Sequence, residues 1–174
     1  VLADISESVK DTAKELGYEG FVIDVSKEEE IKSLIAFTNE TLGGVDIFCS
    51  NAGIAGAFGL LEVSTEDWQQ IWDINFVAHA HAAKHVIPQM LDQGSGYLVN
   101  TASAAGLLTQ IGAAPYSVTK AAAVSLAEWI KITYGEKGIG VSCLCPQAVK
   151  TAMTAQGPGV AGVDGMIEAD ECAK

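Results

Sequence analysis

Tyr116 and Lys120 are the first residues of this chain whose types and spacing could do chemistry. They stand four positions apart in the stretch APYSVTK, residues 114–120, and residues four apart on a helix share one face. An ammonium close to a phenol favours the phenolate, so this pair would make Tyr116 a usable general acid/base. Taken singly, the two residues would equally be a packed tyrosine and a surface lysine.

Two more polar residues could serve the same site. Ser103 ends an apolar run thirteen positions before Tyr116, so a loop could bring its hydroxyl beside the phenol to hydrogen-bond a substrate oxygen. Asn75 lies on the same helix face as Ile71 and Phe76, and a buried amide needs hydrogen-bond partners. Its role is therefore either a structural tie to a neighbouring strand or support of the catalytic group.

The three histidines do not predict a metal site. His81 and His85 share a helix face, and His79 stands close by, but the pattern supplies no carboxylate or cysteine ligand beside them. The chain also contains no GxSxG nucleophile elbow, which leaves a serine hydrolase with little support. We expect core or interface histidines and no metal.

Composition limits the classes of protein that need consideration. The chain has 174 residues, 49% of them hydrophobic, and a net charge of −12, which predicts one globular domain over residues 1–174. The negative charge would repel phosphate backbones and anionic lipid, so neither nucleic acid nor a membrane is an expected partner. Four cysteines without a CxxC pair predict reduced, buried thiols and a cytoplasmic protein; they are Cys49, Cys143, Cys145 and Cys172.

Strand-like and helix-like segments alternate along the chain. Strands are predicted at residues 20–24, 45–50, 96–103 and 139–146, and helices at residues 6–16, from Ser26 to Gly43, from about 65 to 91 and from about 114 to 134. Ser26 and Glu29 predict a capping box, and Pro88 predicts a bend or an end of its helix. Ile31, Leu34, Ile35 and Leu42 form one apolar stripe.

Apolar strands that alternate with helices are typical of an α/β protein with a doubly wound, Rossmann-like parallel sheet covered on both faces. Such sheets bind ligands beyond the carboxyl ends of their strands. At these ends stand Asp4, Asp24, Ser103, residues 50–53 and residues 146–151.

Four stretches in this order resemble the classical short-chain dehydrogenase/reductase family. They are SNAG (50–53), NTASAAG (100–106), YSVTK (116–120) and PQAVKT (146–151), and the resemblance spans essentially the whole chain. Two positions depart from the family pattern: Gln147 stands where a glycine is usual, and Ser50 replaces an asparagine.

The resemblance implies an enzyme that transfers a hydride between a nicotinamide cofactor and an alcohol or carbonyl substrate. It implies Tyr116 as the acid/base, Ser103 as the group that polarises the substrate oxygen, and Lys120 as the residue that tunes Tyr116 and holds the nicotinamide ribose. Asn75 would support a water-linked proton relay to Lys120. Two alternatives stay open: a non-catalytic dinucleotide-binding or interaction protein of the same fold, and an epimerase or dehydratase.

The resemblance also implies the cofactor contacts. Asp24 and Val25 would meet the adenine, and Asn51, Ala52 and Gly53 would line the cofactor cleft. The chain from Pro146 to Thr151, with Val149, would run along the nicotinamide. Asp4 would accept hydrogen bonds from the adenosine ribose, and its charge would repel a 2′-phosphate, which favours NAD over NADP. LLTQIGAA (107–114) and GPGVAGV (157–163) suggest an uncharged, apolar alcohol or ketone as substrate, and the long helices suggest a homodimer or homotetramer.

Two parts that the resemblance implies are absent from this sequence. The family's first strand and its glycine-rich pyrophosphate loop would precede Val1, and its last strand would follow Lys174. In this sheet order the first strand lies between the strand that ends at Asp4 and the strand at 45–50. We therefore expect an incomplete chain in which strand edges lie open at the centre of the sheet.

Overall fold

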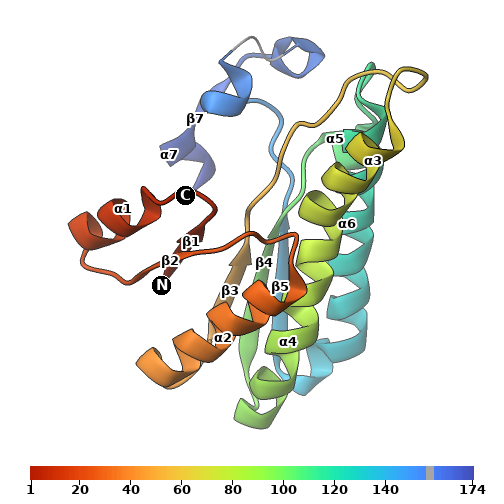
Figure 1. The fold of residues 1–174 in the computed structure, drawn as a ribbon. Helices are drawn as coiled ribbons and strands as arrows, with labels where there is room; N and C mark the ends of the chain where they lie inside the picture. Colours follow the sequence, from red (N-terminus) through yellow and green to blue (C-terminus); the bar gives the residue numbers. More distant parts are fainter. Residues whose placement is uncertain (156–158) are drawn as a thin grey trace.

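The computed structural model describes residues 1–155 and 159–174 and confirms the α/β fold class (Figure 1). Its first half contains β1 (Leu2–Asp4), α1 (Val9–Leu16), β2 (Gly20–Val22), α2 (Glu28–Leu42), β3 (Ile47–Ser50), α3 (Thr65–Trp72), the π-helix η1 (Asp73–Val77) and α4 (Ala78–Gln93). Its second half contains β4 (Gly96–Thr101), α5 (Ala105–Leu108), α6 (Ala114–Tyr134), η2 (Gly135–Lys137), β5 (Ile139–Leu144), β6 (Val149–Lys150), η3 (Ala152–Thr154), η4 (Gly159–Gly162), β7 (Ile167–Glu168) and α7 (Ala169–Cys172).

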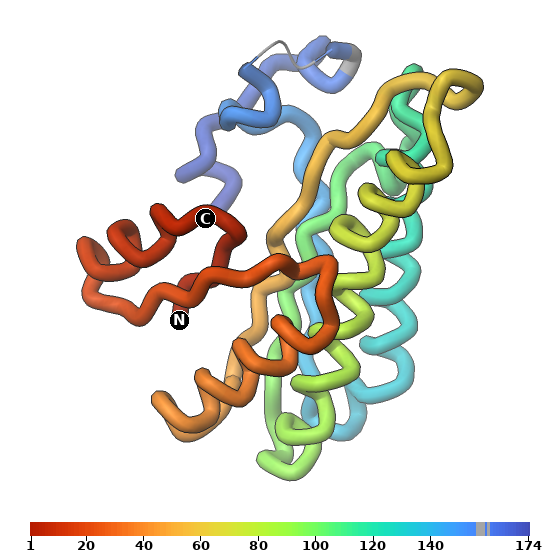
Figure 2. Tube along the Cα trace, viewed as in Figure 1, coloured from red at the N-terminus to blue at the C-terminus, as the bar shows by residue number. Residues whose placement is uncertain are grey.

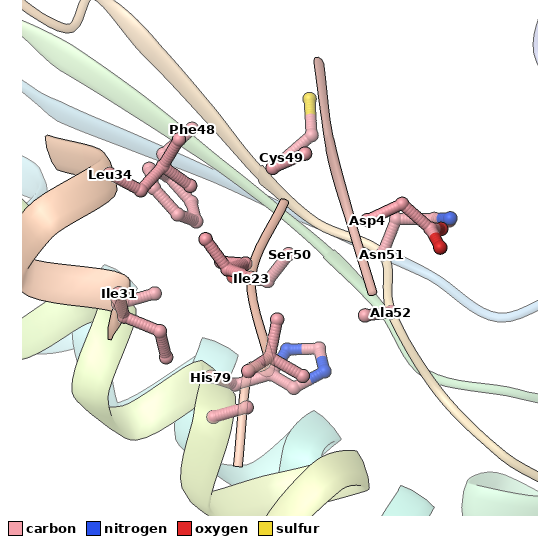
Figure 3. Close-up of a pocket in the computed structure, with 14 residues that line it drawn as sticks. Asp4, Ile23, Ile31, Leu34, Phe48, Cys49, Ser50, Asn51, Ala52 and His79 are labelled. Carbon is pink, nitrogen blue, oxygen red and sulfur yellow. The ribbon is translucent and has the colours of Figure 1, made fainter. Parts of the chain in front are cut away.

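The strands pair in parallel in three separate groups. β1 pairs with β2, β3 with β4 and β4 with β5, and a small pair joins β6 to β7. The sheet is therefore divided between β1 and β3, the place at which the sequence predicts an additional strand. A cavity of about 130 Å³ lies there, bordered by Asp4, Ile23, Phe48 and His79 (Figure 3).

The core lies between the three-stranded sheet and the long helices. α4 and α6 pack side by side against β3, β4 and β5, and α2 packs against α4 (Figure 1). Leu98 and Ile139 of the sheet are fully buried, as are Val86 and Met90 of α4. Burial of each such side chain contributes about 1.5–3 kcal/mol, so this layer fixes the strand ends that carry the site.

The opposite face of the sheet is open. Ile47, Tyr97 and Leu144 point to this face and are 63%, 40% and 38% exposed. Cys49 of β3 is exposed on the same side, and the other three cysteines are partly exposed. All four thiols are free, as expected, but the prediction that they are buried is wrong: Cys49 lies on the open face of the sheet, and the other three are partly exposed.

The helix predicted at 65–91 is interrupted, although not at the proline. Ser64 caps α3 by accepting a hydrogen bond from the Asp67 N–H at 3.0 Å, and the chain widens into the π-helix η1 before α4 begins. Pro88 lies inside α4, which continues to Gln93. Because proline has no N–H, the Lys84 carbonyl lacks the hydrogen bond that it would accept within the helix. Both residues are exposed, so water can donate to this carbonyl instead.

Two details at the ends of α2 differ from prediction. The helix begins after Lys27 without a side-chain cap, and the Ser26 hydroxyl instead donates to Asp24 Oδ1 at 2.7 Å. At the other end Leu42 is 63% exposed, so it does not continue the buried stripe of Ile31, Leu34 and Ile35. Among residues 1–155 and 159–174, no helix combines the length and the apolarity that a membrane crossing requires.

Candidate active site

A cavity of about 720 Å³ opens at the carboxyl ends of β1, β3, β4 and β5. Of the site residues predicted from the sequence, all except Asn75 line it: Asp4, Asp24, Val25, Asn51, Ala52, Gly53, Ser103, Tyr116, Lys120, Pro146, Val149 and Thr151. Residues of α7 border the same cavity as Asp4, and Figure 2 shows the C-terminal segment lying beside the N-terminal one. The fold therefore gathers the predicted groups, from Asp4 to Thr151, into one cleft that the C-terminal segment also borders.

Helix α6 presents Tyr116 and Lys120 to the cavity. Pro115 lies in its first turn, where a missing N–H costs no helical hydrogen bond. Ser117 ties the preceding loop down, because its hydroxyl accepts from the Gln110 N–H at 2.9 Å. The Lys120 ammonium nitrogen lies 5.8 Å from the centre of the Tyr116 ring, which places the predicted pair together on one face.

Lys120 is held as a buried cation. Its side chain is 3% exposed, and its ammonium donates to the Thr101 carbonyl at the end of β4 at 2.9 Å. Burial lowers the pKa of Lys120 to about 8, against an ordinary value of 10.5. The Lys120 charge also helps to lower the pKa of His79 to about 4, although burial is the larger cause, so His79 is neutral at pH 7.

Asn75 lies behind the cavity wall and ties that wall to η1. Its Oδ1 accepts from the Ile54 N–H at 2.8 Å, and its Nδ2 donates to the Ile54 carbonyl at 2.9 Å. A Cβ on Gly53 would lie 3.2 Å from Asn75 Oδ1 and 3.3 Å from Lys120 Nζ. Asn75 therefore ties its helix to the loop after β3, which is a structural role, and the same contacts bring its amide close to Lys120.

Ser103 is positioned by the turn between β4 and α5. Its hydroxyl accepts from the Ala105 N–H at 3.2 Å and faces the Pro146 carbonyl at 3.5 Å. Gly106 packs against α6 so closely that an added Cβ would lie 2.6 Å from the Lys120 carbonyl. This contact fixes the Ser103 turn against the helix that carries Tyr116 and Lys120.

The far end of the cavity carries two of the predicted carboxylates. Asp4 Oδ1 accepts from the Ser6 N–H at 2.9 Å, and Asp4 itself is exposed at the end of β1. The hydrogen bond from Ser26 lowers the pKa of Asp24 below its ordinary value. The carboxylates of Asp4 and Asp24 can therefore accept hydrogen bonds from a ligand that lies beside Val25.

The opposite wall comes from the segment after β5. Pro146, Val149 and Thr151 line it together with Gln147, whose Nε2 donates to Asp164 Oδ2 at 3.3 Å. This contact joins the cavity wall to the C-terminal segment. Gln147, at the position where the resemblance led us to expect a glycine, is therefore a border of the cavity.

The sequence did not reveal several supporting groups. Thr101 holds Lys120 through its carbonyl and donates from its hydroxyl to Asn51 Oδ1 at 3.0 Å, and the fully buried Thr119 faces Asn75 at 3.4 Å. The Thr101 and Ile54 carbonyls are backbone groups, so the residue types in the sequence do not reveal their role. Thr119, in contrast, could have been found as the polar residue beside Lys120 on the inner face of α6.

The loop expected to line the substrate pocket lies elsewhere. Residues 107–114 do not border the cavity, and Leu108 and Ile111 are each 83% exposed. The apolar lining comes instead from Ile54, Ile74, Leu144 and Met153, residues from four other segments. Of the stretch 157–163, residues 157 and 158 lie outside the described residues.

The histidines of α4 meet a carboxylate that the sequence pattern did not place beside them. Glu28 of α2 lies 2.8 Å from His85 Nε2 and 3.4 Å from His81 Nε2, and Lys84 donates to the same carboxylate at 2.6 Å. These hydrogen bonds, that of Lys84 first, lower the pKa of Glu28 to about 2. In the part of the chain that the structure describes, no three histidine, cysteine or carboxylate side chains are grouped to hold a metal ion.

Comparison with known proteins gives one consistent result. A family model described as short chain dehydrogenase matches residues 1–158. The chain is 37% identical over 143 residues to dehydrogenase/reductase SDR family member 4 of Oryctolagus cuniculus, which covers 82% of this chain and 55% of the relative. It is 35% identical over 132 residues to the meso-2,3-butanediol dehydrogenase of Serratia marcescens, covering 76% and 52%.

A solved structure agrees in fold. The crystal structure of a short-chain dehydrogenase from Streptomyces avermitilis superposes with a TM-score of 0.79 at 26% identity, over 93% of this chain and 58% of that one. The chain thus spans between half and three fifths of the length of these relatives. With its family match, its fold and its cavity in agreement, the chain belongs to the short-chain dehydrogenase/reductase family.

Proposed function

We propose that the protein is an oxidoreductase that transfers a hydride between NAD(H) and an alcohol/carbonyl pair, with Tyr116 as general acid/base. The observation that carries this proposal is the buried Lys120 ammonium, held by the Thr101 carbonyl at 2.9 Å and 5.8 Å from the Tyr116 ring. A buried cation beside a phenol at a ligand-sized cavity is an arrangement for proton transfer.

The family uses a nicotinamide dinucleotide, and the residues of the large cavity fit this group. The volume of about 720 Å³ lies in the range of small-molecule sites, about 300–1,000 Å³. Asp4, Asp24 and Val25 would hold the adenosine half, and Lys120 and Pro146 the nicotinamide half. When bound, the nicotinamide supplies or accepts the hydride.

The chain's own groups would manage the proton and the substrate oxygen. The Tyr116 phenol would give a proton to the carbonyl oxygen or take one from the alcohol, while the Ser103 hydroxyl would orient that oxygen by a hydrogen bond. Lys120 would place its positive charge beside the phenol and hold the nicotinamide ribose. Asn75 would act as a positioning residue, because it holds Ile54 and with it the turn at Gly53.

Asp4 and the charges of the cavity support NAD rather than NADP. Of the described residues that line the cavity, Lys120 is the one cation, so no lysine or arginine there would pair with a 2′-phosphate next to Asp4. Like charges a few ångströms apart near a protein surface repel by about 4 kcal/mol or less. We expect Asp4→Asn to lower the NADH/NADPH ratio of kcat/KM by about tenfold or more, and Asp11→Asn, on the neighbouring helix, to leave it unchanged.

An uncharged, largely apolar alcohol or ketone is the substrate class that the cavity favours. Its substrate side is bordered by Ile54, Ile74, Leu144 and Met153, with Gln70 and Gln147 as polar groups. The Serratia marcescens relative is named for a vicinal diol, so small diols and their hydroxyketones belong beside lipophilic and aromatic alcohols in a substrate panel.

Assembly and location complete the proposal. We propose a homodimer or homotetramer in which α4 and α6 pair across a two-fold axis. Val118, Trp129 and Ile132 of α6 support it, since they are 48%, 56% and 84% exposed. The four free thiols favour a reducing compartment, and we place the protein in the cytoplasm.

The proposal is tested by an alcohol and ketone panel with the full-length protein, read as NADH absorbance and repeated with NADPH. Substrate-dependent formation or loss of NADH supports it. Dinucleotide binding without turnover of any substrate would instead indicate the non-catalytic alternative. Conversion of a substrate with no net change in absorbance would indicate an epimerase or dehydratase.

A further inference from the structure

Cys143 and Cys145 place two thiols side by side at the end of β5. Cys143 lies in β5, Cys145 follows directly after the last residue of that strand, and the two sulfur atoms lie 3.8 Å apart. Both cysteines are free and partly exposed. The proposed hydride transfer uses neither thiol, so the pair is a separate chemical feature of the chain.

The geometry disfavours a disulfide. Cys143 is fixed within β5, because Cys143 pairs with Asn100 and Leu144 pairs with Thr101 of β4. The sulfurs would also have to close from 3.8 Å to about 2.05 Å. Oxidation of the pair would therefore distort the strand end that leads to Pro146.

The same separation suits two bonds to one soft atom. Two sulfurs bonded to one atom at about 2.3 Å lie about 3.3–3.8 Å apart for bond angles of about 90–110°, so the separation of 3.8 Å found here needs little closure. A metal ion would need further ligands, and no third histidine, cysteine or carboxylate joins the pair among the described residues. An atom that needs only two bonds from the protein fits this pair better than a metal ion does.

The charges around the pair favour a neutral ligand. The Lys120 ammonium is close enough to interact electrostatically with both sulfurs, and it would repel an added cation. Burial, and then the neighbouring Cys145, raises the pKa of the Cys143 thiol to about 11, so this thiol keeps its proton at neutral pH. A ligand that bonds to the Cys143 sulfur must therefore carry the proton of that thiol away.

We propose that Cys143 and Cys145 form a chelating site for trivalent organic arsenicals. An arsenoxide, R–As=O, would form two As–S bonds as its As=O bond breaks, and the two S–H protons would leave with the oxygen as water. Arsenic stays trivalent, so no oxidant or reductant is required. The inference does not rest on the proposed function.

The adduct would lie beside the strand end that supports the active site. The Leu144 carbonyl accepts from the Ala102 N–H at 2.8 Å, and the Pro146 carbonyl accepts from the Ala104 N–H at 2.9 Å. These two bonds hold the turn that carries Ser103, so the chelating site and the catalytic turn share one support.

The test treats the folded full-length protein with one equivalent of phenylarsine oxide. We expect one phenylarsenic group on the tryptic fragment 138–150, which contains both cysteines and neither Cys49 nor Cys172. The adduct should survive a monothiol and be removed by a dithiol. Cys145→Ser and Cys143→Ser should each weaken binding by about 100-fold, the gain expected from a second linked contact.

Matched controls and the mapping decide the outcome. Cys49→Ser and Cys172→Ser should retain the adduct, because each removes a thiol outside the pair. Mapping on the unmutated protein keeps the test valid if a variant fails to fold. Labelling only after unfolding in urea, an adduct on another fragment, or monothiol-sensitive binding would each overturn the proposal.

Discussion

The side-chain amide of Asn75 holds both backbone groups of Ile54, with hydrogen bonds of 2.8 and 2.9 Å. The two residues are 21 positions apart, and Asn75 is fully buried in the π-helix η1. π-helical turns are rare and recur at functional sites. Here the turn presents one amide to the loop after β3, which fixes Gly53 beside Lys120.

Asn75→Ala should lower the free energy of unfolding by about 1–3 kcal/mol, because it leaves the N–H and the carbonyl of Ile54 without partners. Urea denaturation of the full-length protein measures this change. Asn39→Ala is the matched control, since it removes a partly buried amide that makes one hydrogen bond, to the Gln89 side chain of α4. Equal losses for the two variants would contradict the role given to Asn75.

Gly106→Ala should destabilise the protein by about 1–3 kcal/mol and lower turnover, because overpacking against a backbone forces that backbone to move. The added Cβ would meet the Lys120 carbonyl carbon and oxygen at 2.6 Å. Gly44→Ala meets only the flexible end of Gln93 at 3.3 Å and should change stability little. Wild-type turnover in Gly106→Ala would show that the Ser103 turn is not fixed by this contact.

The buried Lys120 predicts a specific dependence of stability on pH. Its pKa is about 8 in the folded protein against 10.5 ordinarily, so between these values the unfolded chain binds the extra proton and stability rises with pH. The rise should be on the order of 3 kcal/mol, and Lys120→Met should lack it.

Urea midpoints between pH 7 and 10.5 measure this difference. Lys131→Met removes an exposed lysine from the same helix and reports the effect of one lost positive charge. A stability difference between Lys120→Met and the wild type that stays constant from pH 8 to 10.5 would contradict a buried, neutralisable Lys120.

The sequence predicted those elements whose signals are local. Helix α6 has its predicted bounds, because Pro115 opens it and Gly135 follows it. The strand ends, and with them the cavity residues, follow from the alternation of apolar runs and helices. Tyr116, Ser103 and Lys120 could therefore be assigned to one site before the structure.

Contacts between distant residues could not be predicted in this way. Glu28 meets His85 across 57 positions, and nothing near Glu28 distinguishes it from Glu29. The break at η1 depends on how Asn75 meets Ile54, which no periodicity encodes. The exposure of Leu42 and of the four cysteines likewise depends on which surfaces the fold leaves open.

The central claim is that Tyr116 transfers the proton, and Tyr116→Phe tests it most directly. This variant removes only the phenolic oxygen of Tyr116. Tyr134→Phe removes the phenolic oxygen of a tyrosine at the other end of the same helix and serves as control. With the full-length protein and its best substrate, NADH absorbance should show turnover reduced by about 10²–10⁴-fold in Tyr116→Phe alone, the contribution typical of general acid–base catalysis. Turnover equal to that of the wild type, with the fold intact, would contradict the account.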